Sequence, residues 1–192
     1  MNVLCFKRKG ALSYLLALPI LMIACTSTLT YNEAMLKNEK KVEDPQKLAD
    51  AKFLVEARSY NLLAIALTEA ATTNGYAASV VSLAKENQEE HLEMAKELQK
   101  LARQEKISLP ASMNEEHQRL LSELKSSERS EFDKEFLRVY KRINEEENSS
   151  FMRMATDAAD EDVRAYAARK LDYFKSHETE FETVDADLLK TY

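Results

Sequence analysis

The chain has 192 residues, which is enough for one domain of ordinary size. It contains only 2 Gly and 3 Pro, which favours few, long elements, and its 45% hydrophobic and 31% charged residues exclude a disordered chain. Its formal net charge of −6 argues against nucleic acid as a partner, because phosphate binding needs an excess of Lys and Arg.

The first 24 residues have the pattern of an export signal. Residues 7–9 (Lys-Arg-Lys) are positively charged, and residues 11–24 form an apolar run of 14 residues. This run is too short to cross a bilayer, which takes about 20 helical residues, but it fits the hydrophobic region of a signal peptide. The run ends at Met22-Ile23-Ala24-Cys25. This segment resembles the bacterial lipobox, in which a small residue precedes the cysteine that receives lipid.

We therefore expect a lipoprotein signal peptide over residues 1–24 and a lipidated, palmitate-bearing Cys25 that anchors the chain to a membrane of the bacterial cell envelope. The outer membrane is preferred, and an ordinary secretory signal or a retained anchor is the alternative. Three of the 27 basic residues leave with the signal, so 24 remain against 33 acidic ones and the net charge becomes −9. That charge argues against recruitment to anionic lipid by electrostatics. Cys5 also leaves, so no cysteine pair remains for a disulfide.

Residues 25–43 are polar and unpatterned, and they predict a flexible tether. Residues 44–192 predict one helical domain, because no run alternates like a strand. We expect long helices over about 45–73, 76–104, 128–157 and 161–189, and a shorter helix over about 113–125. Their start signals are Asp44-Pro45, Asn114, Asp160, and Ser130 with Asp133 as a variant capping box.

Apolar residues in each long helix recur at alternating spacings of three and four, which predicts one buried stripe per helix and an all-α four-helix bundle. The connection of residues 105–127 holds the short helix and is long enough to run along the bundle. The third long helix can therefore lie parallel to the second. We also expect the first and last long helices to pack together.

Polar residues interrupt the apolar stripes near the middle of the helices. Because the midpoint of a helix keeps its height when the helix is reversed, such residues should meet whatever the helix directions. These midplane residues are Arg58, Asn87, His91, Asn144, Glu147 and His177. We expect Arg58 and Glu147 to form a charge pair. We expect His117 to be solvated, and Tyr140 and Tyr173 to pack in the core.

From residue 50 to about residue 190 the chain resembles the bacterial envelope family called domain of unknown function 4142, which is regarded as ferritin-like. The matching residues are Asp50-Ala51-Lys52-Phe53-Leu54, Glu90-His91, Leu98, Ala102, Ile107, Leu109, Pro110, Phe132-Asp133, Leu171 and His177. The resemblance implies a ferritin-like four-helix bundle of long helices with a short crossover helix.

Ferritin-like di-iron bundles take a Glu from each of two helices and a Glu-x-x-His motif from each of the other two. Here Gln88 stands three residues before His91 and Phe174 three before His177, so neither copy of the motif is present. Three interpretations stay open. The midplane residues form a buried hydrogen-bonded network, because a buried ionisable group needs a partner, or His91, Glu147 and His177 bind Fe or Zn. In the third, the helices have another register and some of these residues lie on the surface.

Two classes of function follow. The favoured one is a non-catalytic envelope lipoprotein that needs no cofactor and binds an envelope protein partner or supports the envelope under stress. The alternative is a ferritin-like metal-binding or redox protein. The sequence contains no nucleophile–base motif and no glycine-rich phosphate loop, so an enzyme is not favoured.

Overall fold

The structure, a computed structural model of the chain, describes residues 28–191, and the predicted signal peptide and Cys25 lie outside these residues. Within the described residues the regular structure is helical and no strand occurs, so the predicted all-α fold is confirmed. The helices are α1 (Tyr31–Lys41), α2 (Pro45–Asn74), α3 (Ala78–Gln104), α4 (Glu115–Ser126), α5 (Phe132–Asp157) and α6 (Glu161–Thr191). None of these six helices combines the length and the apolar content that a membrane span requires.

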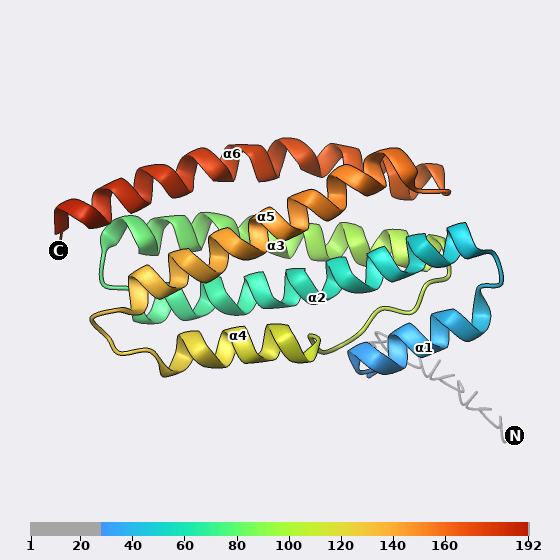
Figure 1. Ribbon diagram of the computed structural model, residues 1–192, viewed down its shortest axis with the longest axis horizontal. Coiled ribbons are helices and arrows are strands. Elements are labelled where there is room, and N and C mark those ends of the chain that lie inside the picture. Colours follow the sequence, from blue (N-terminus) through green and yellow to red (C-terminus); the bar gives the residue numbers. More distant parts are fainter. Residues whose placement is uncertain (1–27, 192) are drawn as a thin grey trace, which may run out of the picture.

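The four long helices α2, α3, α5 and α6 lie side by side as a bundle (Figure 1). Helix α2 packs against α3 and α5, and α6 packs against α5 and α3. Each of these neighbouring pairs is antiparallel, so α3 and α5 run in the same direction on one diagonal of the bundle (Figure 1). The expectation that the first and last long helices pack together is wrong, because α2 and α6 lie on the other diagonal. The reason is the crossover: α4 packs on α2, and α5 therefore enters beside α2.

Helix α1 replaces much of the flexible tether predicted for residues 25–43. The Thr30 side chain accepts a hydrogen bond from the Glu33 backbone, and the Glu33 carboxylate accepts one from the Thr30 N–H, a complete capping box. Ala34 and Asn38 lie one turn apart and are buried, and α1 packs on α2. A helix that packs on one side needs few buried residues, so the low apolar content of the segment was misleading.

The starts of three helices follow the predicted local signals. The side chains of Asp44, Asn114 and Asp160 each accept a hydrogen bond from a backbone N–H in the first turn of α2, α4 and α6, at 2.8, 2.8 and 2.9 Å. These contacts satisfy donors that a helix leaves unpaired at its N-terminus. The predicted N-caps are therefore confirmed at these three positions.

The start of α5 differs from the prediction. Its N-cap is Glu131, which makes no side-chain capping bond, and the proposed box of Ser130 and Asp133 does not form. Asp133 is buried, and its carboxylate accepts hydrogen bonds from the backbone N–H groups of Tyr76 at 3.0 Å and Ala77 at 2.7 Å. Asp133 thus caps the turn between α2 and α3 instead of its own helix.

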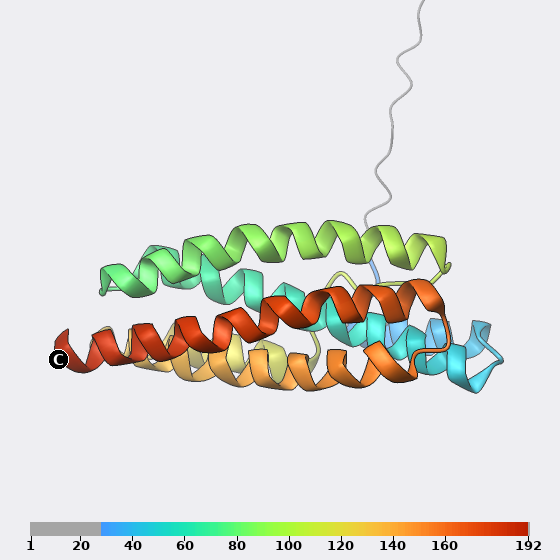
Figure 2. The ribbon, with the colours of Figure 1, turned by 90° about the horizontal axis from the view of Figure 1, so that it is seen from above.

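The hydrophobic core of the bundle consists of two clusters, one toward each end. The first surrounds residues such as Leu67, Phe136 and Phe181, and the second surrounds residues such as Leu54 and Phe151. On every long helix, buried polar residues lie between the stretches that supply the two clusters. They are Ser59 and Asn61 on α2, Asn87 and His91 on α3, Glu147 on α5, and His177 on α6. The view from above shows α3 beside α2 and α6 beside α5 around this middle section (Figure 2).

Candidate functional site

His91 is the centre of a hydrogen-bond network that joins all four long helices. Its Nε2 atom lies 2.8 Å from the Tyr140 hydroxyl oxygen on α5 and 3.0 Å from the Tyr173 hydroxyl oxygen on α6. From α2, the Asn61 amide donates to the His91 carbonyl at 2.8 Å and lies 3.5 Å from His91 Nδ1. The two tyrosines, expected only to fill the core, therefore bring their hydroxyl groups to the imidazole.

Asn87 lies one turn before His91 and completes the network. Tyr140 and Tyr173 donate to Asn87 Oδ1 at 3.0 and 3.3 Å, and Asn87 Nδ2 donates to the Leu83 carbonyl at 2.8 Å. When both hydroxyls donate to Asn87, their oxygens accept a hydrogen bond from His91, which requires the tautomer with the proton on Nε2. In the other tautomer His91 Nε2 accepts from the hydroxyls instead. We refer to Asn61, Asn87, His91, Tyr140 and Tyr173 as the His91 network.

Burial keeps the His91 network uncharged near neutral pH. Desolvation, with a smaller contribution from His177, lowers the pKa of His91 to about 3. Desolvation likewise raises the pKa values of Tyr140 and Tyr173 well above their ordinary value. A neutral imidazole between two neutral phenols suits hydrogen bonding across the bundle.

Glu147 is buried on α5 and stands apart from this network. Its Oε1 atom has no hydrogen-bond partner among the described residues, and burial raises the pKa of its carboxyl to about 8. The predicted charge pair with Arg58 does not form: Arg58 is only partly buried, and its Nη1 atom donates to Asn61 Oδ1 at 3.4 Å on its own helix. Proximity to the midplane fixes the height of a residue along its helix, but not its direction around the helix axis.

His177 is buried on α6 beside Tyr173, with ring centroids 4.0 Å apart. Its Nδ1 atom has no hydrogen-bond partner among the described residues. The nearest carboxylate oxygens belong to Glu90 on α3, 3.7 Å from Nε2, and to Glu180, 3.9 Å from Nδ1. Burial lowers the pKa of His177 to about 4. The remaining midplane residue, Asn144, is partly buried and donates to the Phe174 carbonyl at 3.4 Å.

An open groove of about 590 Å³ runs between α3 and α6 next to these histidines. Glu90, Lys170 and Tyr173 are among the residues that line it. Tyr173 is only partly buried, and its hydroxyl reaches His91. The Tyr173 side chain therefore lies between this groove and His91.

His117 forms a second buried contact that the sequence analysis missed. It was expected to be solvated, yet only 3% of it is exposed, and its Nδ1 atom lies 2.7 Å from Ser59 Oγ on α2. The same Ser59 oxygen accepts from the Asn114 backbone N–H at 2.9 Å, so the contact fixes the start of α4 on α2. The signal was available: His117, Leu120 and Leu124 share one face of α4 and are all buried.

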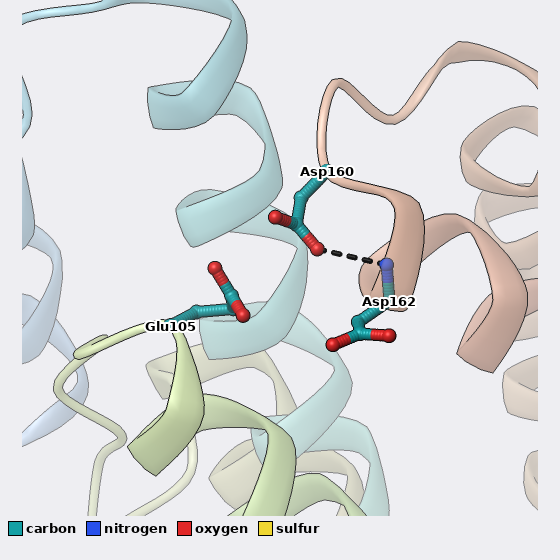
Figure 3. A group of neighbouring side chains, drawn as sticks. All are labelled: Glu105, Asp160 and Asp162. Carbon is teal, nitrogen blue, oxygen red and sulfur yellow. Dashed lines mark hydrogen bonds between the residues drawn. The ribbon is translucent and has the colours of Figure 1, made fainter.

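A group of carboxylates lies at the end of the bundle where α3 ends and α6 begins (Figure 3). Glu105, Asp160 and Asp162 bring oxygen atoms within 4.8 Å of one another. Burial, and then repulsion by Asp160, raises the pKa of Glu105. Asp160 already uses one oxygen to cap α6, as the contact with the Asp162 N–H in Figure 3 shows. Glu105 therefore keeps its proton to a higher pH than an exposed carboxyl group does.

The proposed metal ligands do not converge in the same way. Among the described residues, the three carboxylates of Figure 3 form the one group of His, Cys, Asp or Glu with ligand atoms within 4.8 Å of each other. His91, Glu147 and His177 do not form such a group. These three residues therefore do not fit a shared metal ion as they are arranged.

Comparison with known families matches residues 36–184 to the family described as Domain of unknown function (DUF4142). The chain belongs to the DUF4142 family. The matched segment begins within α1 and ends within α6, so it contains the whole His91 network and all six midplane residues of this DUF4142 chain. No curated protein and no solved structure matches it.

Proposed function

We propose that this DUF4142 chain is a bacterial cell-envelope lipoprotein, in which residues 1–24 direct export and Cys25 carries the lipid anchor. The observation that carries the proposal is the 14-residue apolar run that follows a basic segment and ends at Ala24-Cys25. The anchor places the domain on a membrane of the cell envelope, preferably the outer membrane.

Metabolic labelling with a fatty-acid analogue tests the anchor. The full chain is expressed in a bacterium and its label and mass are measured. Wild type should take up label and lose the signal peptide, whereas Cys25→Ala should take up none and keep the precursor mass. Cys5→Ala is the matched control, because Cys5 leaves with the signal, and it should behave as wild type. Labelled, processed Cys25→Ala protein would overturn the proposal.

The domain behind this anchor is a ferritin-like bundle with a non-catalytic role. Two antiparallel helical pairs, α2–α3 and α5–α6, are joined by a crossover that holds α4, and this connectivity supports the ferritin-like assignment. The His91 network supports the non-catalytic role, because its polar atoms are directed at one another and its groups are neutral near pH 7. A catalytic acid or base is more effective when its pKa lies near the working pH.

The role itself is binding of an envelope protein partner or support of the envelope under stress. In cells that lack the protein, osmotic or detergent stress should release more periplasmic content than in wild-type cells. Wild-type protein should restore the barrier, and Cys25→Ala should not, because the unanchored domain is no longer held at the membrane. Equal leakage with and without the protein would contradict the stress role.

A metal-binding or redox protein remains the second candidate, and one observation favours it. Glu147 Oε1 and His177 Nδ1 are both buried without a hydrogen-bond partner among the described residues, and an Fe or Zn ion would supply one if the side chains moved together, since they do not converge in the present arrangement. Elemental analysis of the purified protein decides between the candidates. We expect far less than one equivalent of metal per chain. About one equivalent, lost in both His91→Ala and His177→Ala, would favour the metal protein.

A further inference from the structure

Helix α1 is fixed to the body of the bundle. The buried Asn38 side chain pairs with the backbone of Ser108 in both directions: Asn38 Nδ2 donates to the Ser108 carbonyl and Ser108 N–H donates to Asn38 Oδ1, each at 2.9 Å. Just before α1, the Leu29 carbonyl accepts from the Ala111 N–H at 2.7 Å. Helix α1 and the linker between α3 and α4 therefore form one unit with α2.

This attachment leaves little free chain between the domain and the proposed lipid. Leu29 follows Cys25 by only four positions, which span at most roughly 14 Å when fully extended. The 30 residues of α2 extend for about 45 Å, so the bundle is much longer than its link to the membrane. If Cys25 carries lipid, as proposed above, the surface around α1 has to stay close to the bilayer.

Helix α1 carries three lysines and two glutamates, so it has a small positive charge in a chain that is acidic as a whole. Its exposed residues include Leu36, Lys37, Lys40 and Lys41, which we call the α1 surface. Lys41 donates to the Lys106 carbonyl, and none of the three lysines forms an ion pair within the described part of the chain. Leu36 adds an apolar side chain that is 54% exposed.

The acidic residues of α1 are already engaged. Glu33 accepts hydrogen bonds from the backbone N–H and hydroxyl of Thr30, at 2.8 and 2.9 Å. Glu39 pairs with Lys52 of α2 at 2.7 Å. Glu33 keeps its negative charge, because its partners are neutral, whereas the charge of Glu39 is balanced by Lys52. The three lysines of the α1 surface therefore exceed the unpaired acidic residues of α1 by two, and this excess is available to an outside partner.

We propose that the α1 surface lies against a bilayer that contains anionic phospholipid. The partner is identified by two observations: the short chain from Cys25 to Leu29, and a basic, partly apolar face in a chain whose mature charge is −9. The negative surface potential of such a bilayer attracts the lysines of α1 and repels the acidic remainder. The lipid recruits the protein and the charge pattern orients it, so the net charge does not oppose the interaction.

Site-specific fluorescence quenching tests this orientation in the full, lipidated protein. A fluorophore is attached to Leu36→Cys on α1 or to Leu189→Cys, near the far end of α6 (Figure 1). Each added cysteine is then the sole reactive thiol, because Cys5 leaves with the signal and the Cys25 sulfur is acylated. The protein is placed in vesicles of phosphatidylethanolamine and phosphatidylglycerol with a nitroxide on the lipid headgroups. We expect strong quenching at position 36 and little at position 189.

The lysines are tested by Lys37→Gln, Lys40→Gln and Lys41→Gln combined. This variant should float with the vesicles as wild type does and keep its melting temperature, but lose quenching at position 36. A control combines Lys85→Gln, Lys100→Gln and Lys125→Gln, three exposed lysines outside α1, and should keep the quenching. Equal quenching at positions 36 and 189, or no effect of the α1 changes, overturns the orientation alone. Failure of the wild type to float overturns the lipid anchor and, with it, this proposal.

Discussion

Asp50 and Asp133 make reciprocal hydrogen bonds: each lies in one antiparallel helix pair and binds the turn that connects the two helices of the other pair. Asp133, at the start of α5, accepts hydrogen bonds from the backbone N–H groups of Tyr76 and Ala77 in the α2–α3 turn. Asp50, at the start of α2, accepts from those of Ala159 and Asp160 in the α5–α6 turn, at 3.1 and 2.8 Å. Each carboxylate is buried and accepts hydrogen bonds from two backbone donors next to a helix end.

Removing either carboxylate should destabilise the bundle. We expect Asp50→Ala and Asp133→Ala each to lower the free energy of unfolding by about 2 kcal/mol, because two backbone donors lose a charged acceptor. Asp50→Asn and Asp133→Asn, which keep one acceptor oxygen, should lose less. Asp172→Ala, an exposed change on α6, is the control and should stay within about 0.5 kcal/mol of wild type. Urea denaturation followed by circular dichroism measures all five variants, and wild-type values for both alanine variants would contradict the capping role.

The two aspartates also belong to an internal repeat with a spacing of 83 positions. Residue 50 corresponds to 133, and the turn residues 76–77 correspond to 159–160. The same spacing relates Phe53 to Phe136, Val80 to Val163 and Ala84 to Ala167, all of which are buried. At the midplane the repeat is kept only in part: Asn61 corresponds to Asn144, whereas His91 corresponds to Phe174 and Glu147 to Ala64. The two halves therefore share a scaffold but differ at most of the polar positions in its centre.

The long helices could be predicted from sequence because their signals are local. Asp44-Pro45 starts α2, Asp160 caps α6, and the apolar spacing marks one buried stripe per helix. Asp133 could not be assigned in this way: its partners lie 56 and 57 positions away, so its proximity to Ser130 suggested the wrong capping box. Tertiary contacts of this kind leave no local pattern.

The sequence predicts how far along its helix each residue of the candidate site lies, but not which residue it contacts. His91, Glu147 and His177 lie in the buried middle of the bundle, as their positions along the helices indicate. Arg58 satisfies the same criterion but is directed along α2, where it meets Asn61. A residue's height follows from counting, whereas its partner depends on how the helices rotate against one another, which the spacing of apolar residues fixes only to within a stripe.

The hydroxyl of Tyr140 should contribute to stability through the His91 network. Tyr140→Phe removes a hydrogen bond to His91 Nε2 and one to Asn87 Oδ1, leaving Tyr173 as the partner of both atoms. We expect a loss of about 1–2 kcal/mol in the free energy of unfolding. Tyr166→Phe is the matched control, because the hydroxyl of this buried tyrosine makes no hydrogen bond within the part of the chain that the structure describes, and its loss should be smaller. A Tyr140→Phe variant as stable as Tyr166→Phe would show that the network adds nothing to stability.

Glu147 should make the protein less stable as the pH rises. Its carboxyl has a pKa of about 8 in the folded chain and an ordinary value of 4.5 when exposed, so the folded state holds more protons between these values. Stability is therefore lost as the pH increases from about 4.5 to 8 and is level above that range. Glu147→Gln keeps the shape without the charge, and we expect it to be about 3 kcal/mol more stable than wild type at pH 7 and nearly equal to it at pH 4.5.

Urea denaturation across this pH range measures the effect of Glu147→Gln. Glu145→Gln, an exposed change two positions earlier, is the control and should leave the pH dependence as it is in wild type. If Glu147 instead forms an ion pair that the bundle needs, Glu147→Gln will be less stable than wild type at pH 7. That result would indicate that Glu147 has a charged partner such as Arg58, and would contradict the finding that Glu147 is buried without one.

His177 should act in the opposite direction and destabilise the protein in acid. Burial lowers its pKa to about 4, below the ordinary 6.5, so the unfolded chain holds more protons between these values. Stability that is present above pH 6.5 is therefore lost as the pH falls toward 4. Glu90 and Glu180 lie within 4 Å and favour the charged ring, yet their exposure to water weakens that attraction and desolvation prevails. His91, with a pKa of about 3, adds to the loss in the same direction.

Proton NMR of the imidazole rings measures this directly, because the chain contains only 3 histidines and single substitutions assign each signal. We expect the His177 signal to titrate with a midpoint near 4, and His177→Phe to lose less stability than wild type between pH 6.5 and pH 4. Phenylalanine can keep the ring contact with Tyr173 while removing the nitrogen that lacks a partner. A midpoint near 6.5 would mean that water or a carboxylate reaches the ring, and that the seam between α3 and α6 is open at His177.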